Sequence, residues 1–233
     1  MIGKIISISG LDGAGKSTQL ELLRKKLDHA GVKCAGLQFE AEDYGERAQL
    51  KVNDLKRNQV IFSRLCIDWK NRFPLMHDFV YSESLQNKNN AMAVTSVFAG
   101  GCLQVYHECL KPLLAEGVHI ILDRYWFDDI IYRGFWVDEA TVRLMYSSIP
   151  APDLAIFLNT PPAISFDRNQ ERIDGKSPLM RDIQNVKIIS DKFNELARNE
   201  NMFIVDGSQE LEVKHNKIFN KVYSFLYDHP EGK

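Results

Sequence analysis

The sequence has little of what marks several large classes of protein. Its 233 residues include four cysteines, none in a CxxC pair, and no histidine cluster with the spacing of a zinc site. Reduced thiols in the cytosol are therefore expected. The N-terminus lacks a basic region followed by an apolar run and a small-residue cleavage site, and no apolar run approaches the roughly 18 residues of a membrane span. We expect a cytoplasmic protein that makes no contact with membranes.

An excess of charge of one sign is also lacking. The chain has 29 Lys and Arg against 31 Asp and Glu, which gives a formal net charge of -2. This balance gives no reason to expect binding to nucleic acid through bulk electrostatics, so any anion must be held by local chemistry. The 45% hydrophobic content is sufficient for a substantial core.

Short apolar runs recur along the chain, at 4–9, 32–39, 118–123, 153–158 and 202–206. Continuous runs of this kind suit strands that are buried on both faces, and helical patterns lie between them. The alternation predicts a three-layer α/β/α fold around a five-stranded parallel sheet. A further helix is expected to start near Thr160, with Thr160 as its cap and Pro161 in its first turn. Because no repeat or linker is visible, we expect one domain, 1–233.

Residues 40–97 do not follow this alternation. They carry many charges, two helical-looking stretches and the polar run SESLQNKNN. We expect a helical insertion that ends in a loop, and its role is either a peripheral solvated subdomain or a substrate-specific lid.

A glycine-rich loop stands between the first apolar run and a helical pattern. Gly10, Gly15, Lys16 and Ser17 satisfy GxxxxGK[ST], with a predicted strand before and a predicted helix after. In such a loop, backbone amides and a helix N-terminus converge on phosphate oxygens, the lysine reaches the outer phosphates and the hydroxyl coordinates Mg²⁺. The motif predicts binding of a nucleoside triphosphate.

Charged residues at two later points fit phosphoryl transfer. Asp123 follows the run VHIIL, so its carboxylate is expected at the strand end beside the loop as a second Mg²⁺ partner, with Arg124 next to it. A strand-end ion pair is the alternative reading. The stretch 168–181 places Arg168 and Arg172 on one helical face, followed by Lys176 and Arg181. This stretch is either a basic lid that excludes water or an ordinary solvated helix end.

A guanine-nucleotide switch has the same loop but normally adds DxxG after a strand and NKxD for the base. Asp123 is followed by RYW, and the near miss NKNN at 87–90 has no Asp and follows no predicted strand. These absences favour a kinase over a switch.

Together, these motifs resemble the thymidylate kinase family of P-loop nucleoside monophosphate kinases. GLDGAGKSTQ is similar to its phosphate loop, FAGGCLQVYHECLKPLL (98–114) to its central helix, and DRY (123–125) to its strand-end motif. PDLAIFLNTPP, the arginine-bearing lid and VDGS (205–208) continue the resemblance, which covers about three quarters of the chain. It implies an ATP-dependent transfer of a phosphoryl group, most simply from ATP to dTMP with Mg²⁺, and a homodimer packed through helices.

The resemblance also implies roles for individual residues. The catalytic set would be Lys16, Asp12, Arg124, Arg168 and Arg172, with Ser17 and Asp123 serving the metal. Nucleotide would be bound by Gly10, Gly13, Ala14, Gly15, Lys16, Ser17, Thr18, Asp206 and Gly207, and acceptor by Phe98, Arg124 and Tyr132. To the acceptor site we add Asp128, a carboxylate near the same pocket, and Gln38, which stands near the position of a family arginine. Phe98 would stack on the acceptor base, although its helical spacing with Cys102 and Tyr106 suits core packing equally well.

At two positions the sequence departs from the family pattern, and both concern the acceptor phosphate. The resemblance implies arginines for the acceptor phosphate four residues after Phe98 and after the second strand, where this sequence has Cys102 and Gln38. Each charge-assisted hydrogen bond to phosphate contributes about 1.5–3 kcal/mol, so the loss is large. Arg47, Arg57 or Arg64 would then supply the charge from the insertion, or the acceptor is a nucleoside or another molecule without a 5′-phosphate. A non-catalytic nucleotide-binding protein is the alternative of another class.

Overall fold

Six parallel strands form the centre of the protein in the computed structural model, which describes residues 2–37, 59–63, 88–171 and 178–227. The strands are β1 (Ile5–Ser9), β2 (Cys34–Leu37), β3 (Val60–Ser63), β4 (His119–Asp123), β5 (Leu154–Asn159) and β6 (Phe203–Asp206). Their order across the sheet is β2-β3-β4-β1-β5-β6.

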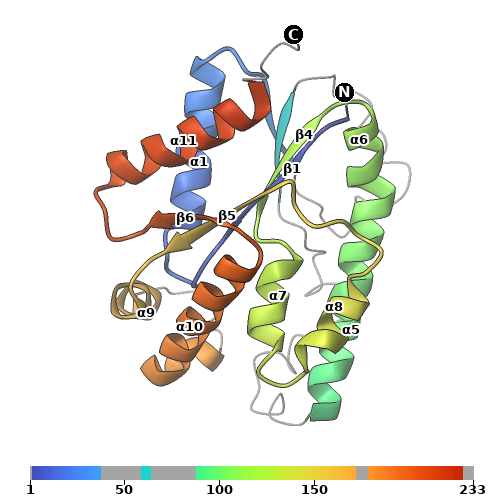
Figure 1. Ribbon diagram of the computed structural model, residues 1–233, viewed down its shortest axis with the longest axis vertical. Coiled ribbons are helices and arrows are strands. Elements are labelled where there is room, and N and C mark those ends of the chain that lie inside the picture. Colours follow the sequence, from blue (N-terminus) through green and yellow to red (C-terminus); the bar gives the residue numbers. More distant parts are fainter. Residues whose placement is uncertain (1, 38–58, 64–87, 172–177, 228–233) are drawn as a thin grey trace.

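Helices cover both faces of this sheet (Figure 1). Helices α1 (Lys16–His29) and α11 (Leu211–Tyr227) lie side by side on one face. On the other lie α5 (Lys88–Val105), α6 (Lys111–Ala115), α7 (Trp126–Arg133) and α8 (Glu139–Met145), with a π-helical segment, η2 (Tyr106–Leu110), between α5 and α6. Helices α9 (Pro162–Gln170) and α10 (Ile183–Asn199) flank a short 3₁₀ turn, η3 (Pro178–Arg181). The three layers confirm the predicted α/β class.

The apolar runs form the central strands because both of their faces are covered. All five residues of β1 are buried, and Ile6 lies level with Ile121 of β4 on one side and Leu154 of β5 on the other. Burying an aliphatic side chain of this size contributes about 1.5–3 kcal/mol, so the three runs stabilise one another. The result is a continuous core under the site at the end of β1.

The predicted number of strands was wrong. All five expected strands are present, but β3 is a sixth, and it lies inside the stretch 40–97 that we expected to be helical. Val60 pairs with Cys34 on one side and with His119 on the other, so β3 is an interior strand of the sheet. Its three apolar residues, flanked by polar ones, are too short a pattern to identify as a strand from the sequence.

The sheet has its switch point at β1. From β1 the chain continues to β2, β3 and β4 on one side of the sheet, and β5 and β6 follow on the other. In open parallel sheets, ligands bind beyond the carboxyl ends of the strands at such a point. The glycine-rich loop follows β1 directly, which places it there.

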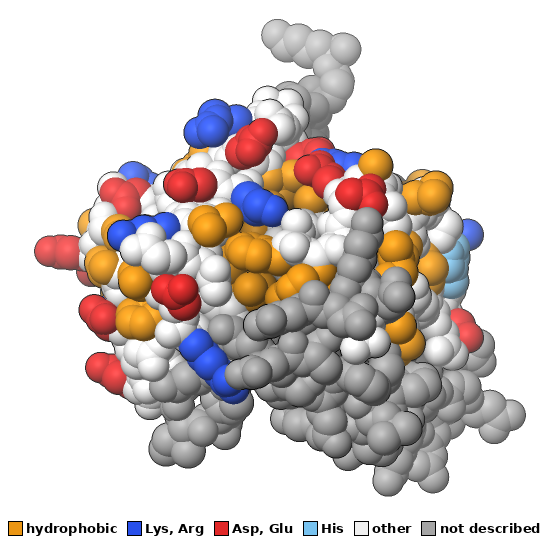
Figure 2. All heavy atoms as spheres, turned by 90° about the horizontal axis from the view of Figure 1, so that it is seen from below, with side chains coloured by type: hydrophobic (Ala, Val, Ile, Leu, Met, Phe, Trp, Pro, Cys, Tyr) orange, Lys and Arg blue, Asp and Glu red, His pale blue; other side chains and the backbone are white. Residues whose placement is uncertain are grey.

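The surface carries charges of both signs. On the described part of the face in Figure 2, acidic and basic side chains are interspersed with hydrophobic ones. None of the helices in the described ranges is long and apolar enough to cross a bilayer.

Candidate active site

The glycine-rich loop joins β1 to α1 and is held by the strand beside it. Helix α1 begins at Lys16, with Gly15 as its N-cap. The Ala14 carbonyl accepts a hydrogen bond of 3.0 Å from the Thr160 hydroxyl, just past the end of β5. The predicted helix cap at Thr160 was therefore wrong: Pro161 is the N-cap of α9, and the Thr160 hydroxyl is used to anchor the loop.

Lys16 is buried inside this loop. Its Nζ donates hydrogen bonds to the carbonyls of Gly10 at 3.0 Å and Leu11 at 2.8 Å. Burial, together with the neighbouring charge of Arg124, lowers the pKa of Lys16 to about 8, although nearby carboxylates oppose the shift. Lys16 is thus held where phosphate oxygens would replace these two carbonyls as hydrogen-bond acceptors.

Arg124 faces the same loop from the end of β4. Its Nη1 donates to the Gly10 carbonyl at 3.1 Å and to Asp128, and its Nη2 donates to Asp12. Its guanidinium also lies over the Tyr132 ring, 5.1 Å from the centroid. Burial opposes the charge, yet the oxygens around it raise the pKa of Arg124 well above its usual value.

The backbone of Arg124 is strained. Its φ of 71° is in the left-handed region, which a non-glycine residue adopts at a cost of about 1–3 kcal/mol. The Arg124 amide donates to the Ile8 carbonyl at 3.1 Å, and α7 begins two residues later. Strained residues of this kind cluster at functional sites, and here the turn directs the arginine back across the end of β1.

A small cavity of about 80 Å³ joins these groups. It is lined by the loop, the first turn of α1 and the end of β4, namely Asp12, Gly13, Gly15, Lys16, Ser17, Thr18, Asp123 and Arg124. Such a volume accommodates a phosphate group, and Ser17 and Asp123 both face it. Within the described ranges, no group of three or more His, Cys, Asp or Glu side chains forms a metal site.

Of the predicted lid, Arg168 and Arg181 lie in the described part. Arg168 is an exposed residue of α9, and one of its guanidinium nitrogens lies 4.0 Å from the position that a Cβ would take on Gly15. Arg168 thus lies beside the phosphate loop. Arg181 is the exposed last residue of η3, while Arg172 and Lys176 lie outside the described residues.

Asp206 and Gly207 follow β6. The Asp206 carboxylate accepts hydrogen bonds from the Ser208 amide at 2.9 Å and hydroxyl at 2.6 Å, and these bonds lower its pKa. The Gly207 carbonyl accepts from Lys214 Nζ at 3.0 Å, and its amide donates to the Asn159 carbonyl at 2.8 Å. This loop is thereby tied to the end of β5 beside Thr160.

The predicted acceptor residues lie on two helices. On α7, Asp128 and Tyr132 face the phosphate loop, where the Tyr132 hydroxyl accepts a hydrogen bond from the Asp12 amide at 3.2 Å. Phe98 on α5 lies instead against Arg133, whose guanidinium carbon is 4.3 Å from the ring centroid. Arg133 Nε is 3.6 Å from the Asp129 carboxylate. Gln38, like Arg47, Arg57 and Arg64, lies outside the described residues.

Replacing Cys102 by arginine is expected to destabilise the fold without restoring an acceptor contact. Cys102 is 4% exposed and lies beside the Tyr125 and Tyr146 hydroxyls. An arginine there must place a much longer, charged side chain in the buried core, so the free energy of unfolding should fall by about 3 kcal/mol or more. Thermal denaturation of Cys102→Arg against Cys102→Ser measures this. An arginine variant that is as stable as the serine variant and has faster turnover contradicts it.

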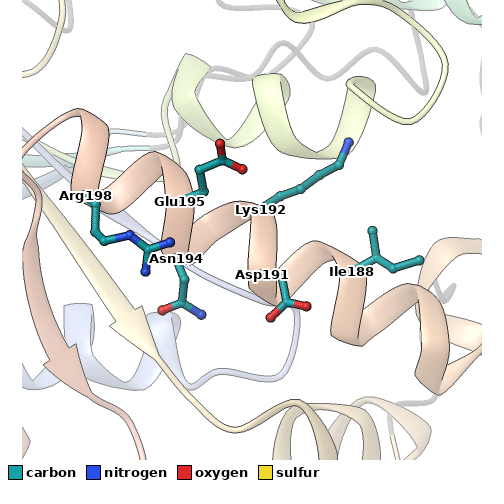
Figure 3. Close-up of a pocket in the computed structure, with 6 residues that line it drawn as sticks. All are labelled: Ile188, Asp191, Lys192, Asn194, Glu195 and Arg198. Atoms are coloured by element: carbon teal, nitrogen blue, oxygen red, sulfur yellow. The ribbon is translucent and has the colours of Figure 1, made fainter.

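A second, larger hollow lies on α10. Its volume is about 550 Å³, and Figure 3 shows its lining, which is Ile188, Asp191, Lys192, Asn194, Glu195 and Arg198. Lys192 donates to the Gly134 carbonyl at 3.1 Å, and Asn194 accepts from Asn159 at 3.1 Å. None of the predicted site residues lines this surface, so it is separate from the phosphate loop.

The sequence did not identify several residues around the loop. Ser9 donates to Asp128 at 2.6 Å, Thr160 anchors Ala14, Lys214 holds Gly207, and Arg133 covers Phe98. Only Ser9 and Thr160 carried a signal, as hydroxyls at the ends of buried strands. The other two contacts carried no signal: Lys214 follows Gly207 by seven residues, and Arg133 and Phe98 lie on different helices.

The loop, the buried lysine and the strand-end arginine and aspartate on a doubly wound parallel sheet define a P-loop phosphotransferase. The thymidylate kinase family model matches residues 81–218, which is more than half of the chain. The chain belongs to the thymidylate kinase family and is an ATP-dependent phosphotransferase.

Similar proteins align over nearly the whole chain. Probable thymidylate kinase 1 of Saccharolobus solfataricus is 24% identical over 208 residues, which cover 89% of this chain and 90% of that protein. Thymidylate kinase of Francisella philomiragia is 25% identical over 228 residues, covering 94% and 97%. That of Caldanaerobacter subterraneus is 24% identical over 244 aligned positions, covering 97% and 98%.

Proposed function

We propose that this protein transfers the γ-phosphoryl group of ATP to the phosphate of a nucleoside monophosphate, most simply dTMP. The observation that carries the proposal is the convergence of Lys16, Arg124 and the loop on one cavity at the end of β1. The resemblance to thymidylate kinases over most of the chain supports dTMP as the acceptor.

The donor phosphates would lie at the N-terminus of α1. There the unpaired amides of the first turn carry a partial positive charge, and Lys16 adds a full one. In the transfer, an oxygen of the acceptor phosphate bonds to the γ-phosphorus while the bond from that phosphorus to the β,γ-bridging oxygen breaks. The products are ADP and the acceptor diphosphate, with no covalent enzyme intermediate. Catalysis is then mainly positioning and charge stabilisation.

The residues present fit a Mg²⁺ ion. Ser17, an exposed residue in the first turn of α1, and Asp123, at the end of β4, line the same cavity, and oxygen ligands of this kind suit Mg²⁺. When bound, the ion neutralises phosphate charge. Ser17 and Asp123 would hold it, while Lys16 and Arg168 would supply the remaining positive charge around the transferred group.

A second candidate acceptor is a molecule without its own phosphate. Arg124, the cation best placed for an acceptor phosphate, is shared between the carboxylates of Asp12 and Asp128. Cys102, at the position where the resemblance implies an arginine, is buried and uncharged. These two observations favour an acceptor hydroxyl over a dianionic phosphate, as in a nucleoside.

The acceptor assay is expected to show rapid ADP formation with dTMP. The measurement compares dTMP with other monophosphates, with free nucleosides and with no acceptor, in the presence of ATP and Mg²⁺. Because a kinase site excludes water, the rate without acceptor should be at least about 100-fold lower. If no monophosphate stimulates ADP formation but a nucleoside does, the second candidate is supported. ATP binding without turnover of any acceptor overturns both candidates.

A further inference from the structure

A buried carboxylate, that of Asp128, lies behind Arg124 in the candidate site. Asp128 lies in the first turn of α7 and is 3% exposed. Its Oδ1 accepts from Arg124 Nη1 at 2.5 Å, and its Oδ2 accepts from the Ser9 hydroxyl at 2.6 Å. The Tyr125 amide, 3.5 Å from Oδ2, adds a weaker contact. Both oxygens are therefore engaged with the protein, and the side chain is turned away from solvent.

The geometry points to Asp128 as a positioning residue that acts through Arg124, and this inference rests on the proposed phosphoryl transfer. Asp128 fixes the guanidinium of Arg124 across the loop so that it faces the acceptor phosphate. Ser9 in turn fixes Asp128. The role differs from the direct contact with acceptor that the sequence predicted for Asp128.

The arrangement accounts for how a strained arginine is held in one orientation. The Arg124 guanidinium is bonded on one edge to Asp128 and the Gly10 carbonyl, and on the other to Asp12. Asp12 is in the loop and 27% exposed, whereas Asp128 is fixed by the sheet and by α7. Of the two carboxylates, Asp128 is therefore the rigid one, because its own partners belong to β1 and to the start of α7.

The charge of Asp128 has a second consequence. When ionised, it balances part of the positive charge of Lys16, which is buried, and of Arg124, which is partly buried, before any phosphate is bound. Burial raises the pKa of Asp128, although Arg124, Lys16 and the Ser9 hydroxyl oppose that rise.

Kinetics of Asp128→Asn, Asp128→Ala and Arg124→Ala, together with the double variants, test the inference. Asparagine can still accept from Arg124 and donate to Ser9, so kcat with dTMP should fall only about tenfold, whereas alanine leaves the guanidinium unfixed and should cost about 100-fold. The KM for acceptor should rise in both Asp128 variants. The KM for ATP should change less than about twofold, because Asp128 itself does not line the cavity of the phosphate loop.

The double variants give the decisive comparison. If Asp128 acts through Arg124, adding Asp128→Asn or Asp128→Ala to Arg124→Ala changes kcat/KM by less than about twofold. If the double variant loses the product of the two single-variant losses in kcat/KM, the inference is wrong. It is also wrong if kcat falls only to match the loss of folded protein, with unchanged KM for acceptor, which a merely structural role predicts. If Asp128→Ala does not fold, the comparison of Asp128→Asn, Arg124→Ala and their double variant decides alone.

Two controls separate this inference from the proposed function. Asp191→Asn makes the same chemical change on the exposed surface of α10 (Figure 3) and should leave all constants unchanged. Wild-type turnover with dTMP is measured first. Its absence overturns the proposed acceptor, whereas normal wild-type turnover with an unaffected Asp128→Ala variant overturns only the role of Asp128.

Discussion

Lys16→Ala should reduce phosphoryl transfer by about 1,000-fold or more and leave the protein folded. A single preorganised group that stabilises developing charge typically contributes 10²–10³ in kcat, and Lys16 is buried, where such a charge acts most strongly. The measurement is the ADP-forming rate at saturating ATP and acceptor, with ATP affinity determined separately by titration.

The fold should tolerate this change because two effects oppose each other. Alanine removes the hydrogen bonds from Nζ to the Gly10 and Leu11 carbonyls, but it also removes a cation whose pKa burial has lowered to about 8. We expect the free energy of unfolding to change by no more than about 2 kcal/mol.

A matched lysine on the same helix serves as the control. Lys25 is exposed on α1 and pairs with Glu21 at 2.6 Å, so Lys25→Ala should leave turnover unchanged and cost less than about 1 kcal/mol. If Lys16→Ala keeps more than a tenth of wild-type turnover, the lysine is not part of the transfer site and the proposed mechanism is wrong.

The sequence predicted those parts of the fold that depend on contiguous residues. Strands such as β1 and β4 are continuous apolar runs, and the loop between β1 and α1 is a motif in which each residue type has a fixed role. Strand β3 lacked both properties. It is a strand because β2 and β4 pair with it on both sides, and that information lies in their sequences as well as in its own.

The candidate site was predictable to a similar degree. Lys16, Ser17, Asp123 and Arg124 are at motif positions, and the structure brings them around one cavity. The contacts of Asp128 were not predictable, because Ser9 is 119 residues away and the pair forms only when α7 returns to the end of β1. The same holds for Arg133 and Phe98, which only the packing of α7 on α5 brings together.

Gly13→Ala should weaken both the fold and ATP binding, because the phosphate loop touches α9 at this residue. A Cβ on Gly13 would lie 2.4 Å from the Ser165 carbonyl oxygen and 3.2 Å from its carbon. Ser165 and Asn169 are buried, so the backbone of α9 cannot yield without loss of packing. We expect the free energy of unfolding to fall by about 3 kcal/mol or more and ATP affinity to fall about tenfold.

Gly31→Ala is a matched control for the backbone conformation alone. Both glycines have φ of 83°, but a Cβ on Gly31 would meet no atom within 4 Å. The left-handed conformation by itself costs an alanine about 1–2 kcal/mol, so Gly31→Ala should show only that loss, with unchanged ATP affinity. Urea denaturation and ATP titration of the two variants separate the cost of the left-handed backbone from the cost of the clash with α9. Equal losses in both would mean that α9 does not hold the loop, and the phosphate site would then depend on the backbone of its own motif alone.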